Sequence, residues 1–508
     1  MIKRRFLFFV CLLIFVAVIL APAQSKDNNP KREKSLHVAI PFPFDGNLDP
    51  AERNYIALQP FFRAIYSTLY KLDAQLRPRP FLAASYEQRA KTFILDIKKE
   101  ALFSDGTGIT ATDAIAAIEM SMSNSRYPTP LCNVIQGGEE FFQGKSKHCS
   151  GIKMTGPKRL EIQLREKNIQ FAHYLTSSLM SIIPAHRNQK QKVATFTGAF
   201  RVVDIRFQEK ETLVTLKPNP HYLGNKSKIT ILYFHFYKTP ADFEHAIYKG
   251  DPELFLYIEH FKIPYSGYKY NYFKIPIHGA FYLQLNPLKG PFKDKQLRKF
   301  FKEFILSLDL GHRKGWELTT PTKLVLPYGL TGYSVFNQMV PRDFRKLIPA
   351  QKVKLVALNT TSKIKEELFI FLKAKLAKYN VELELQWESR EKVIPRIRSG
   401  DFDIISYNYM VDVPLSSYFY ETIFTPGHGM NNLGYQVPDA THILDNYYQE
   451  SDEFVRLRIL SHLEELAQEE SFLIPVITPL SILGYKRNVS NVKIDKFLNV
   501  NFEDIDVY

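Results

Sequence analysis

The pattern of apolar and polar positions predicts alternating strands and helices along most of the chain. Short alternating or fully apolar runs predict strands, and apolar residues at helical spacing predict helices. The expected strands are residues 36–42, 92–97, 159–164, 212–216 and 229–236, and the expected helices are residues 57–72, 113–122 and 452–468. Phe454 is expected on the apolar face of the last helix. This alternation is typical of an α/β protein.

The clearest architecture is expected between residues 353 and 407. Three strands, 353–358, 381–387 and 402–407, alternate with two helices, 364–376 and 391–399. Strand–helix–strand–helix–strand predicts a parallel or mixed sheet covered by helices. Pro395 lies inside the second helix and predicts a kink or a later start there, because proline removes a backbone donor.

Residues 1–23 have the pattern of a secretory signal peptide. Lys3, Arg4 and Arg5 precede an apolar run, and Ala21-Pro22-Ala23 supplies the small residues of a cleavage site. The alternative is an uncleaved membrane anchor, although the run is short against the about 20 residues that span a bilayer. Residues 24–35 are then a flexible polar leader, and the remaining chain is expected to be soluble.

Composition and charge narrow the class of partner. The 508 residues are 45% hydrophobic and 23% charged, which is typical of folded domains. The formal charge of +15 falls to +12 without residues 1–23. The basic residues are spread along the chain, so we expect a solvated basic surface and no nucleic-acid partner.

Two cysteines, Cys132 and Cys149, remain after the first 23 residues. An oxidising compartment permits a disulfide between them, worth about 3 kcal/mol in the chain-entropy model. The alternative is a pair of free thiols. Whether bridged or free, we expect the two cysteines to affect local stability and not to take part in a reaction.

The sequence contains little that suggests catalysis. No nucleophile motif or metal-ligand spacing is present, and the 13 histidines are scattered. The pairs Glu464-Glu465 and Glu469-Glu470 are expected on a solvated helix face, since adjacent helical residues point apart. A binding protein without a metal or cofactor is therefore favoured over an enzyme.

Residues 91–118 carry a set of short motifs that resembles the family 5 solute-binding proteins, the peptide-binding subunits of ABC importers. The motifs are Phe103, the Asp105-Gly106 turn and the helix start Thr110-Ala111-Thr112-Asp113. Other matches follow in the family's order: Leu48-Asp49-Pro50, Thr197-Gly198-Ala199-Phe200, Asn219-Pro220, Pro291-Phe292-Lys293-Asp294 and Gly400-Asp401-Phe402-Asp403. The ordered set spans about residues 36–485.

The resemblance implies a two-lobe periplasmic binding protein fold with an inserted subdomain and a hinge between the lobes. Lobe I would comprise residues 36–66, 185–277 and 487–508. Residues 67–184 would form the subdomain inserted into lobe I, and residues 278–486 would form lobe II. We expect the lobes to close over a ligand.

The resemblance also implies where a ligand is held. The family anchors a peptide ammonium with an aspartate that aligns with Asp412, and Tyr409 stands where the family has tryptophan. Asn431 and Tyr127 are weaker candidates for hydrogen bonds to the ligand. The family's second D-P is replaced by Leu415 and Ser416, which puts the local loop shape in doubt.

The function implied is an exported, monomeric, periplasmic peptide-binding protein that delivers its ligand to an ABC transporter permease. A retained anchor would tether it to the inner membrane. Two alternatives stay open: the same fold binding a nickel complex, haem or an oligosaccharide, and a secreted hydrolase or chaperone that has lost transport. Retention of Asp412 favours a ligand with a free amine.

Overall fold

The structure is a computed structural model, and the fold is that of the unit Ser35–Tyr508. The structure describes residues 33–50, 56–123, 129–186, 195–257, 269–308, 310, 319–322, 324–336, 338–340, 342–360, 363–495 and 497–508. The predicted signal peptide, most of the predicted leader and Tyr127 lie outside the described residues. Their assignments stay predictions.

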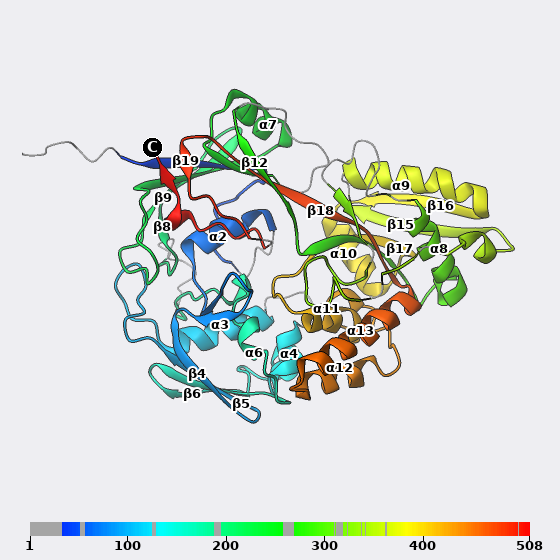
Figure 1. The fold of residues 1–508 in the computed structure, drawn as a ribbon, viewed down its shortest axis with the longest axis horizontal. Coiled ribbons are helices and arrows are strands. Elements are labelled where there is room, and N and C mark those ends of the chain that lie inside the picture. The colour runs from blue at the N-terminus through cyan, green and yellow to red at the C-terminus, as the bar shows by residue number, and fades with distance from the viewer. Residues whose placement is uncertain are drawn as a thin grey trace, which may run out of the picture. The chain divides into compact units, whose positions relative to one another are not determined.

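One large mixed sheet runs through the unit (Figure 1). Its strands are, in spatial order, β16 (Val381–Glu388), β15 (Val353–Thr360), β17 (Ile404–Met410), β13 (Gly279–Leu285), β18 (Leu473–Tyr485), β11 (Leu254–Tyr257), β1 (Ser35–Ile40), β10 (Ile231–Tyr237), β9 (Glu211–Pro218) and β8 (Phe200–Phe207). Strand β1 pairs in parallel with both β10 and β11, and β10, β9 and β8 pair antiparallel. The strands expected in these segments are confirmed.

The long strand β18 connects the two halves of this sheet. Its first part pairs with β13, and its last part pairs with β11 and with β12 (Asn271–Pro276). A further short strand, β14 (Thr319–Pro321), pairs with its middle. The chain also passes between the halves where β12 ends and β13 begins. These two crossings are the positions at which a two-lobe fold can bend.

The architecture expected between residues 353 and 407 is confirmed. Strand β15 pairs in parallel with β16 and with β17. Helices α9 (Lys363–Leu376) and α10 (Arg390–Ser399) connect them, and α8 (Lys295–Ser307) belongs to the same half. Helix α10 already begins at Arg390 and continues through Pro395, so the later start considered from the sequence is wrong.

A separate sheet belongs to the segment between residues 67 and 184. Its order is β4 (Ala83–Arg89), β5 (Thr92–Ile97), β7 (Arg159–Gln163) and β6 (Ile152–Gly156). Helix α3 (Ala111–Ser123) begins at the predicted threonine–aspartate motif, where Asp113 accepts hydrogen bonds from the amide and hydroxyl of Thr110, both at 2.7 Å. The remaining short elements here are β2 (Tyr70–Leu72), β3 (Pro78–Pro80), α4 (Pro130–Val134), α5 (Gly138–Phe142), α6 (Phe171–Tyr174) and η2 (Ser178–Met180).

The helix expected over residues 57–72 is shorter in the structure. A single 3-10 turn, η1 (Ile56–Leu58), leads into α2 (Gln59–Ile65), which ends at Tyr66 in extended conformation. Residues 70–72 then form strand β2. The apolar spacing persisted beyond the helix because Leu69 and Tyr70 are buried in a different core.

Helices α11 (Ser416–Phe424), α12 (Ala440–Gln449) and α13 (Glu453–Glu470) pack together (Figure 1). Asp452 caps α13 by accepting hydrogen bonds from the amides of Phe454 and Val455. Three expectations for this helix are wrong: Phe454 is 78% exposed, and Glu464 and Glu470 are only 1% and 9% exposed. The carboxylate of Glu464 is buried because it accepts hydrogen bonds from two loop amides at residues 325 and 326.

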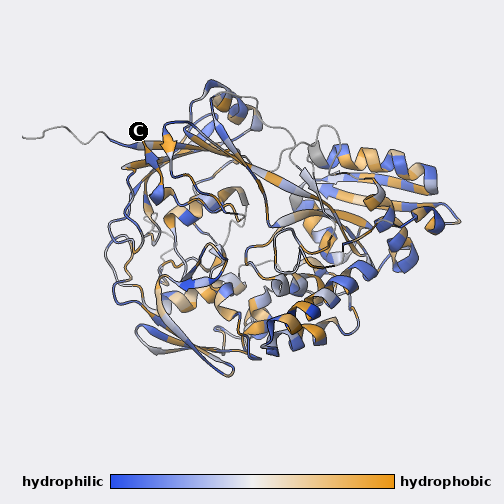
Figure 2. Ribbon diagram, in the orientation of Figure 1, coloured by the Kyte–Doolittle hydropathy of each residue, from blue (hydrophilic) through white to orange (hydrophobic). Residues whose placement is uncertain are grey.

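Three main hydrophobic cores hold these elements together. The first joins residues 36–66, 183–256 and 483–505, and the second lies within residues 281–477. The third joins residues 69–182 to residues 280–473, so the smaller sheet and helices α11–α13 share one core. Figure 2 shows the alternation of apolar and polar residues along α9 and α13 that one-sided burial requires. The lobe boundaries themselves stay a prediction.

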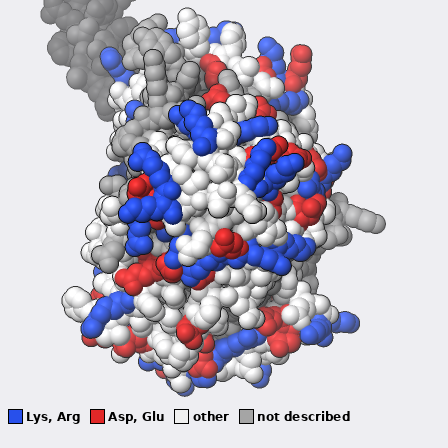
Figure 3. Space-filling model, turned by 90° about the vertical axis from the view of Figure 1, so that its right-hand side faces the viewer, with Lys and Arg blue, Asp and Glu red and all other residues white. Residues whose placement is uncertain are grey.

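Acidic and basic side chains are interspersed on the face that Figure 3 shows. Ion pairs such as Lys352–Glu382 and Arg89–Glu87 join exposed neighbours of opposite charge. Mixing of this kind is typical of a solvated surface.

Candidate functional site

Asp412 lies in the short segment between strand β17 and helix α11. Strand β17 pairs with β13, and the ladder continues past its end, since the amide of Val411 donates to the carbonyl of His278 at 2.8 Å. The backbone on both sides of Asp412 is therefore held by buried structure. Its carboxylate projects from a fixed position.

The carboxylate of Asp412 is half-buried and bound by hydroxyl groups. Ser177 donates to its Oδ2 at 2.7 Å. Burial raises the pKa of Asp412, and the hydrogen bonds from Ser177 and Tyr418 and the nearby Arg63 act in the opposite direction. Within the described part of the chain, no cationic nitrogen lies within 4 Å of this carboxylate. A desolvated carboxylate without a fixed counter-ion is suited to a cationic group brought by a ligand.

Ser177 comes from a segment 235 residues away from Asp412 in the sequence. It lies between α6 and η2, where its oxygen also accepts a hydrogen bond from the amide of Leu179. Two further hydrogen bonds join the same segments: Tyr174 donates to Glu421 at 3.2 Å, and Tyr447 donates to the side chain of Gln170 at 2.9 Å. Asp412 thus lies at a contact between residues 170–177 and helices α11–α12.

Tyr409 is the predicted site residue that the structure places near Asp412. Its ring lies against Phe419, with 5.8 Å between ring centroids, and its hydroxyl bonds Thr422. Burial raises its pKa, and the charge of Asp412 contributes to the rise. The hydroxyl of Tyr409 therefore stays protonated at neutral pH, and its ring is in contact with that of Phe419.

Asn431 is 1% exposed, and both ends of its side-chain amide are occupied within one loop. Its Nδ2 donates to the carbonyl of Tyr435 at 2.7 Å, and its Oδ1 accepts the amide of Tyr435 at 2.8 Å. The structure records no contact between Asn431 and Asp412. A ligand could use this amide only by displacing the bonds that hold the loop.

Ser177 and Arg63 are neighbours of Asp412 that sequence analysis missed. Arg63 belongs to α2, and its guanidinium interacts electrostatically with Asp412 and Asp495. A signal for Arg63 was present, because it is the one charged residue of a helix whose other members, residues 59–62, 64 and 65, are buried. No pattern in the sequence distinguishes Ser177 from other serines.

Both Cys132 and Cys149 are free, buried thiols in the structure, which contradicts the predicted disulfide. Their sulfur atoms have separate partners: Cys149 donates to the carbonyl of Gln136 at 3.4 Å, and Cys132 lies 3.7 Å from the hydroxyl of Thr129. Burial raises the pKa of the Cys149 thiol to about 11. Both thiols are therefore held protonated at neutral pH.

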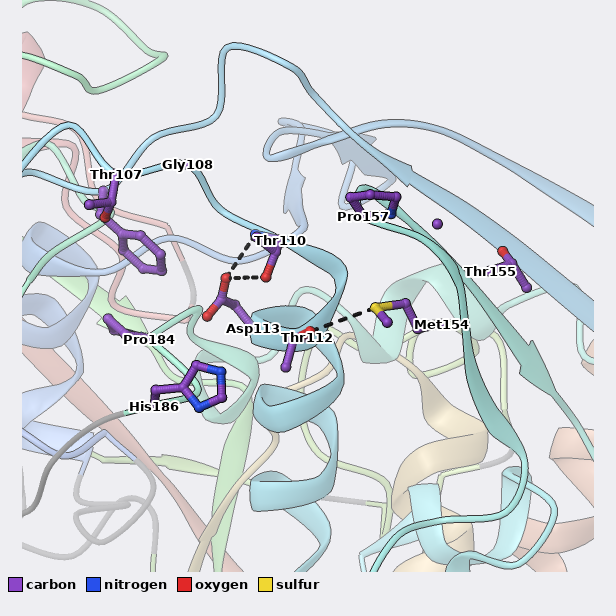
Figure 4. A pocket seen from close by; sticks show the side chains of 12 residues that line it. Thr107, Gly108, Thr110, Thr112, Asp113, Met154, Thr155, Pro157, Pro184 and His186 are labelled. Carbon is purple, nitrogen blue, oxygen red and sulfur yellow. Dashed lines mark hydrogen bonds between the residues drawn. The ribbon is translucent and has the colours of Figure 1, made fainter.

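A cavity of about 720 Å³ lies between the start of α3 and strand β6, away from the predicted site residues (Figure 4). Its walls include Asp113, Met154 and His186. The carboxylate of Asp113 is already occupied by Thr110 and by the amide of Ala185, and Figure 4 shows the bonds to Thr110. Among the described residues that line this cavity, the one carboxylate is therefore already engaged by the protein.

Membrane-spanning helices and metal sites are both absent from the described residues. None of their helices is long and apolar enough to cross a membrane. Within the same ranges, no group of three or more histidine, cysteine, aspartate or glutamate side chains is arranged to hold a metal ion.

Two relatives are similar to this chain over most of its length. The periplasmic oligopeptide-binding protein OppA of Escherichia coli is 22% identical over 472 residues, which covers 85% of this chain and 84% of OppA. The probable D,D-dipeptide-binding periplasmic protein DdpA of the same organism is 21% identical over 450 residues and covers 82% of both chains.

Solved structures of this class share the fold. The oligopeptide-binding protein OppAIV of Borrelia burgdorferi superposes with a TM-score of 0.78 at 18% identity, covering 94% of this chain and 100% of that one. Haemophilus influenzae OppA in complex with RPPGFSPFR gives 0.75 at 15%, covering 94% and 99%. NikA of Brucella suis in complex with Fe(III)-EDTA gives 0.76 at 16%, covering 94% and 100%.

These likenesses confirm the two-lobe periplasmic binding protein fold predicted from the motifs. Residues 77–301 match the family model of bacterial extracellular solute-binding proteins, family 5 Middle. The matched region includes the turn and helix start at residues 103–113 that carried the resemblance. Residues 77–301 are therefore a domain of the bacterial extracellular solute-binding proteins, family 5, and the similarity to the two relatives extends over most of the chain.

Proposed function

We propose that this protein captures peptides between its two lobes and delivers them to the permease of an ABC transporter. The observation that carries the proposal is the Asp412 carboxylate, which is half-buried, fixed by β17 and free of an ion pair among the described residues. A peptide ammonium supplies the charge that this carboxylate lacks. The two relatives bind peptides according to their names, which supports the same ligand class here.

The amino terminus of the peptide would displace or share the hydroxyl of Ser177 at Asp412. Tyr409 would flank it, and Tyr127 would contribute from a segment outside the described residues. A charge-assisted bond gains strength where water is excluded, so closure of the lobes would strengthen this contact. The rest of the peptide would bind through its main chain as an added strand, which leaves room for many sequences.

The export, location and partners of the chain belong to the same proposal. Residues 1–23 would direct export and be cleaved, which leaves a monomeric protein in the periplasm. Both named relatives are periplasmic proteins. The protein would act by binding and release and not by catalysis, since its family consists of solute-binding proteins.

The second candidate is a non-peptide ligand in the same cleft. It is favoured by the likeness to NikA, whose structure holds Fe(III)-EDTA, and to AgaA, whose structure holds agropinic acid. The same fold therefore holds compounds other than peptides. A metal chelate, haem or an oligosaccharide would not require the amine-binding role of Asp412.

Mass spectrometry of the ligand that co-purifies with the exported protein tests the proposal. We expect peptides with free amino termini from the native protein and from Asp401→Asn, a control with an exposed carboxylate. Asp412→Asn keeps the shape of the side chain and should lose the peptides. A metal chelate, haem or a sugar in place of peptides would support the second candidate.

A thermal-shift series provides an independent readout on the same variants. A ligand at about 100 times its dissociation constant adds about 2.7 kcal/mol of stability to the folded state. Peptide mixtures should therefore raise the melting temperature of the native protein and of Asp401→Asn, but not that of Asp412→Asn. Equal shifts in all three proteins would remove Asp412 from the binding site.

A further inference from the structure

A second cavity, of about 320 Å³, lies next to the Asp412 contact. It is enclosed by α2, residues 66–76, the η2 turn and the C-terminal residues 493–503. Ser178, one of its walls, directly follows the Ser177 that binds Asp412. The charged residues of its lining are Arg63, Lys71, Asp73, Lys493, Asp495 and Glu503.

Three residues of this lining carry buried polar atoms without a hydrogen-bond partner in the described structure. They are the Nε of Arg63, the hydroxyl of Ser67 and the Oδ1 of Asn499. Ser67 is only 2% exposed. Buried polar atoms are nearly always paired in folded proteins, so their convergence on one cavity indicates a polar occupant.

The acidic residues of the lining are already engaged by the protein. Asp73 pairs with two arginines, Arg77 at 3.0 Å and Arg79 at 2.9 Å. Glu503 accepts the hydroxyl of Tyr222 at 2.8 Å. Asp495 accepts hydrogen bonds from the amides of residues 497 and 499. Asp495 also interacts electrostatically with Arg63, so each of these carboxylates already has a partner within the protein.

The basic residues of the lining differ in whether their side chains already have a partner within the protein. Lys71 donates to Tyr222 at 2.6 Å, and its ammonium lies 3.9 Å from the centre of the Phe81 ring. Burial lowers the pKa of Lys71 to about 8. Arg63 instead faces the cavity with its Nε unpaired, and Lys493 is exposed at the rim. The buried cationic group that still has an unpaired donor is thus the guanidinium of Arg63.

We propose that this cavity receives the acidic side chain of an aspartate or glutamate near the amino terminus of the bound peptide. The inference rests on the proposed peptide-binding function and adds a substrate preference to it. The charge of Arg63 is balanced by two carboxylates, Asp495 and Asp412. A peptide ammonium at Asp412 neutralises the second of these, so an anion beside Arg63 replaces the charge that is lost. Arginine binds carboxylates through charge-assisted hydrogen bonds.

The size of the cavity agrees with such an occupant. A water molecule takes about 30 Å³ of liquid volume, so the cavity corresponds to roughly ten waters. That space holds one short side chain and several waters. The hydroxyl of Ser67 can donate to the same carboxylate, and Asn499 Oδ1 can accept from a bridging water or a peptide N–H.

Titration calorimetry with matched tripeptides tests the inference. The probes are alanine tripeptides that carry glutamate or glutamine at the first or at the second position. We expect glutamate to bind at least about tenfold more tightly than glutamine at one of these positions. Arg63→Gln should abolish that preference, so that the ratio of the glutamate affinity to the glutamine affinity falls to about one. Arg201→Gln, an exposed change on β8, should leave the preference intact.

The outcomes separate this inference from the function on which it rests. Absence of binding by every tripeptide would contradict the peptide-binding function itself. Equal binding of the glutamate and glutamine peptides by the native protein would overturn only the acidic pocket. If Arg63→Gln does not fold, Lys493→Gln provides the second variant, since this exposed rim residue should reduce the glutamate preference several-fold. An undiminished preference in Lys493→Gln and at 0.5 M salt would also overturn the assignment.

Discussion

At the scale of single residues, burial decides the behaviour of the carboxylates around the site. Asp412 and Glu421 both lie where helix α11 meets residues 170–177. Burial raises the pKa of both groups, in Glu421 to about 8. The two acids nevertheless have different neighbours: Glu421 is bonded by Tyr174, and Asp412 is close to Arg63. We therefore propose a structural role for Glu421 and a binding role for Asp412.

Glu421 predicts a specific pH dependence of stability. Its folded-state pKa lies above the usual value of 4.5, so between about pH 4.5 and 8 the folded chain holds a proton that the unfolded chain has lost. Its contribution to the free energy of unfolding must therefore fall as the pH rises through this window. A difference of one in pKa corresponds to about 1.4 kcal/mol, so the full effect is on the order of a few kcal/mol.

Melting temperatures of the native protein and of Glu421→Gln between pH 5 and 9 measure this effect. The variant cannot ionise at this position, so it should gain stability relative to the native protein as the pH rises. Glu209→Gln, at an exposed position, is the control and should follow the native protein. Parallel curves for Glu421→Gln and the native protein would show that Glu421 does not titrate in this range.

The two buried thiols predict slow chemical modification. The thiolate is the reactive form, and burial raises the pKa of the thiols of both Cys132 and Cys149. Iodoacetamide at pH 8 should label neither cysteine in the folded chain without residues 1–23, and both in denaturant. Mass spectrometry counts the labels. An unlabelled denatured chain that takes up two labels only after reduction would establish the disulfide instead.

At the scale of elements, helix α13 shows that the residues a helix buries depend on the segments that pack against it. Its spacing correctly predicted a helix over residues 452–468. The spacing did not reveal that Glu464 would be buried. Its carboxylate accepts the amides of Val325 and Leu326 and the hydroxyl of Tyr420, so it replaces hydrogen bonds that these loop amides would otherwise lose.

Glu464→Ala should destabilise the protein strongly, and Glu465→Ala should not. The first change leaves two buried backbone amides unpaired, at about 1–3 kcal/mol each. The second removes an exposed side chain from the same helix, with the same gain in helix propensity. Urea or thermal unfolding of the two variants measures the difference. Equal stabilities would mean that the loop amides find other partners.

The elements that sequence analysis predicted well are those whose pattern is local. The strands and helices of residues 353–407 follow from the alternation and spacing of their own residues, and the structure confirms their parallel pairing. The early end of α2 at Ile65 could not be predicted in this way, because Leu69 and Tyr70 enter a second core formed with distant residues. Ser177 was missed for the same reason.

At the scale of the whole molecule, we expect a change between open and closed lobes to alter the contact of residues 170–177 with helices α11–α12. Strand β18 and the β12–β13 connection continue between the two halves of the large sheet. The hydrogen bonds Ser177–Asp412, Tyr174–Glu421 and Tyr447–Gln170 join side chains across the contact, in addition to the apolar core that the two sides share. They would then contribute to the free energy of closure.

Tyr447→Phe tests this role by removing one hydroxyl and its bond to Gln170. We expect a shift towards the open state, seen as a larger radius of gyration by small-angle X-ray scattering, and a several-fold loss of ligand affinity. Tyr248→Phe removes an exposed hydroxyl and is the matched control. An unchanged radius and affinity in Tyr447→Phe would show that this bond does not stabilise closure.

The central claim is that Asp412 recognises the free amine of a peptide. Its most direct test is a calorimetric titration of the native protein with trialanine and with N-acetyl-trialanine, which differ in the ammonium and share the rest of the main chain. Acetylation should weaken binding by at least about 100-fold, because it leaves a half-buried carboxylate unpaired. Equal affinities for the two peptides would contradict it.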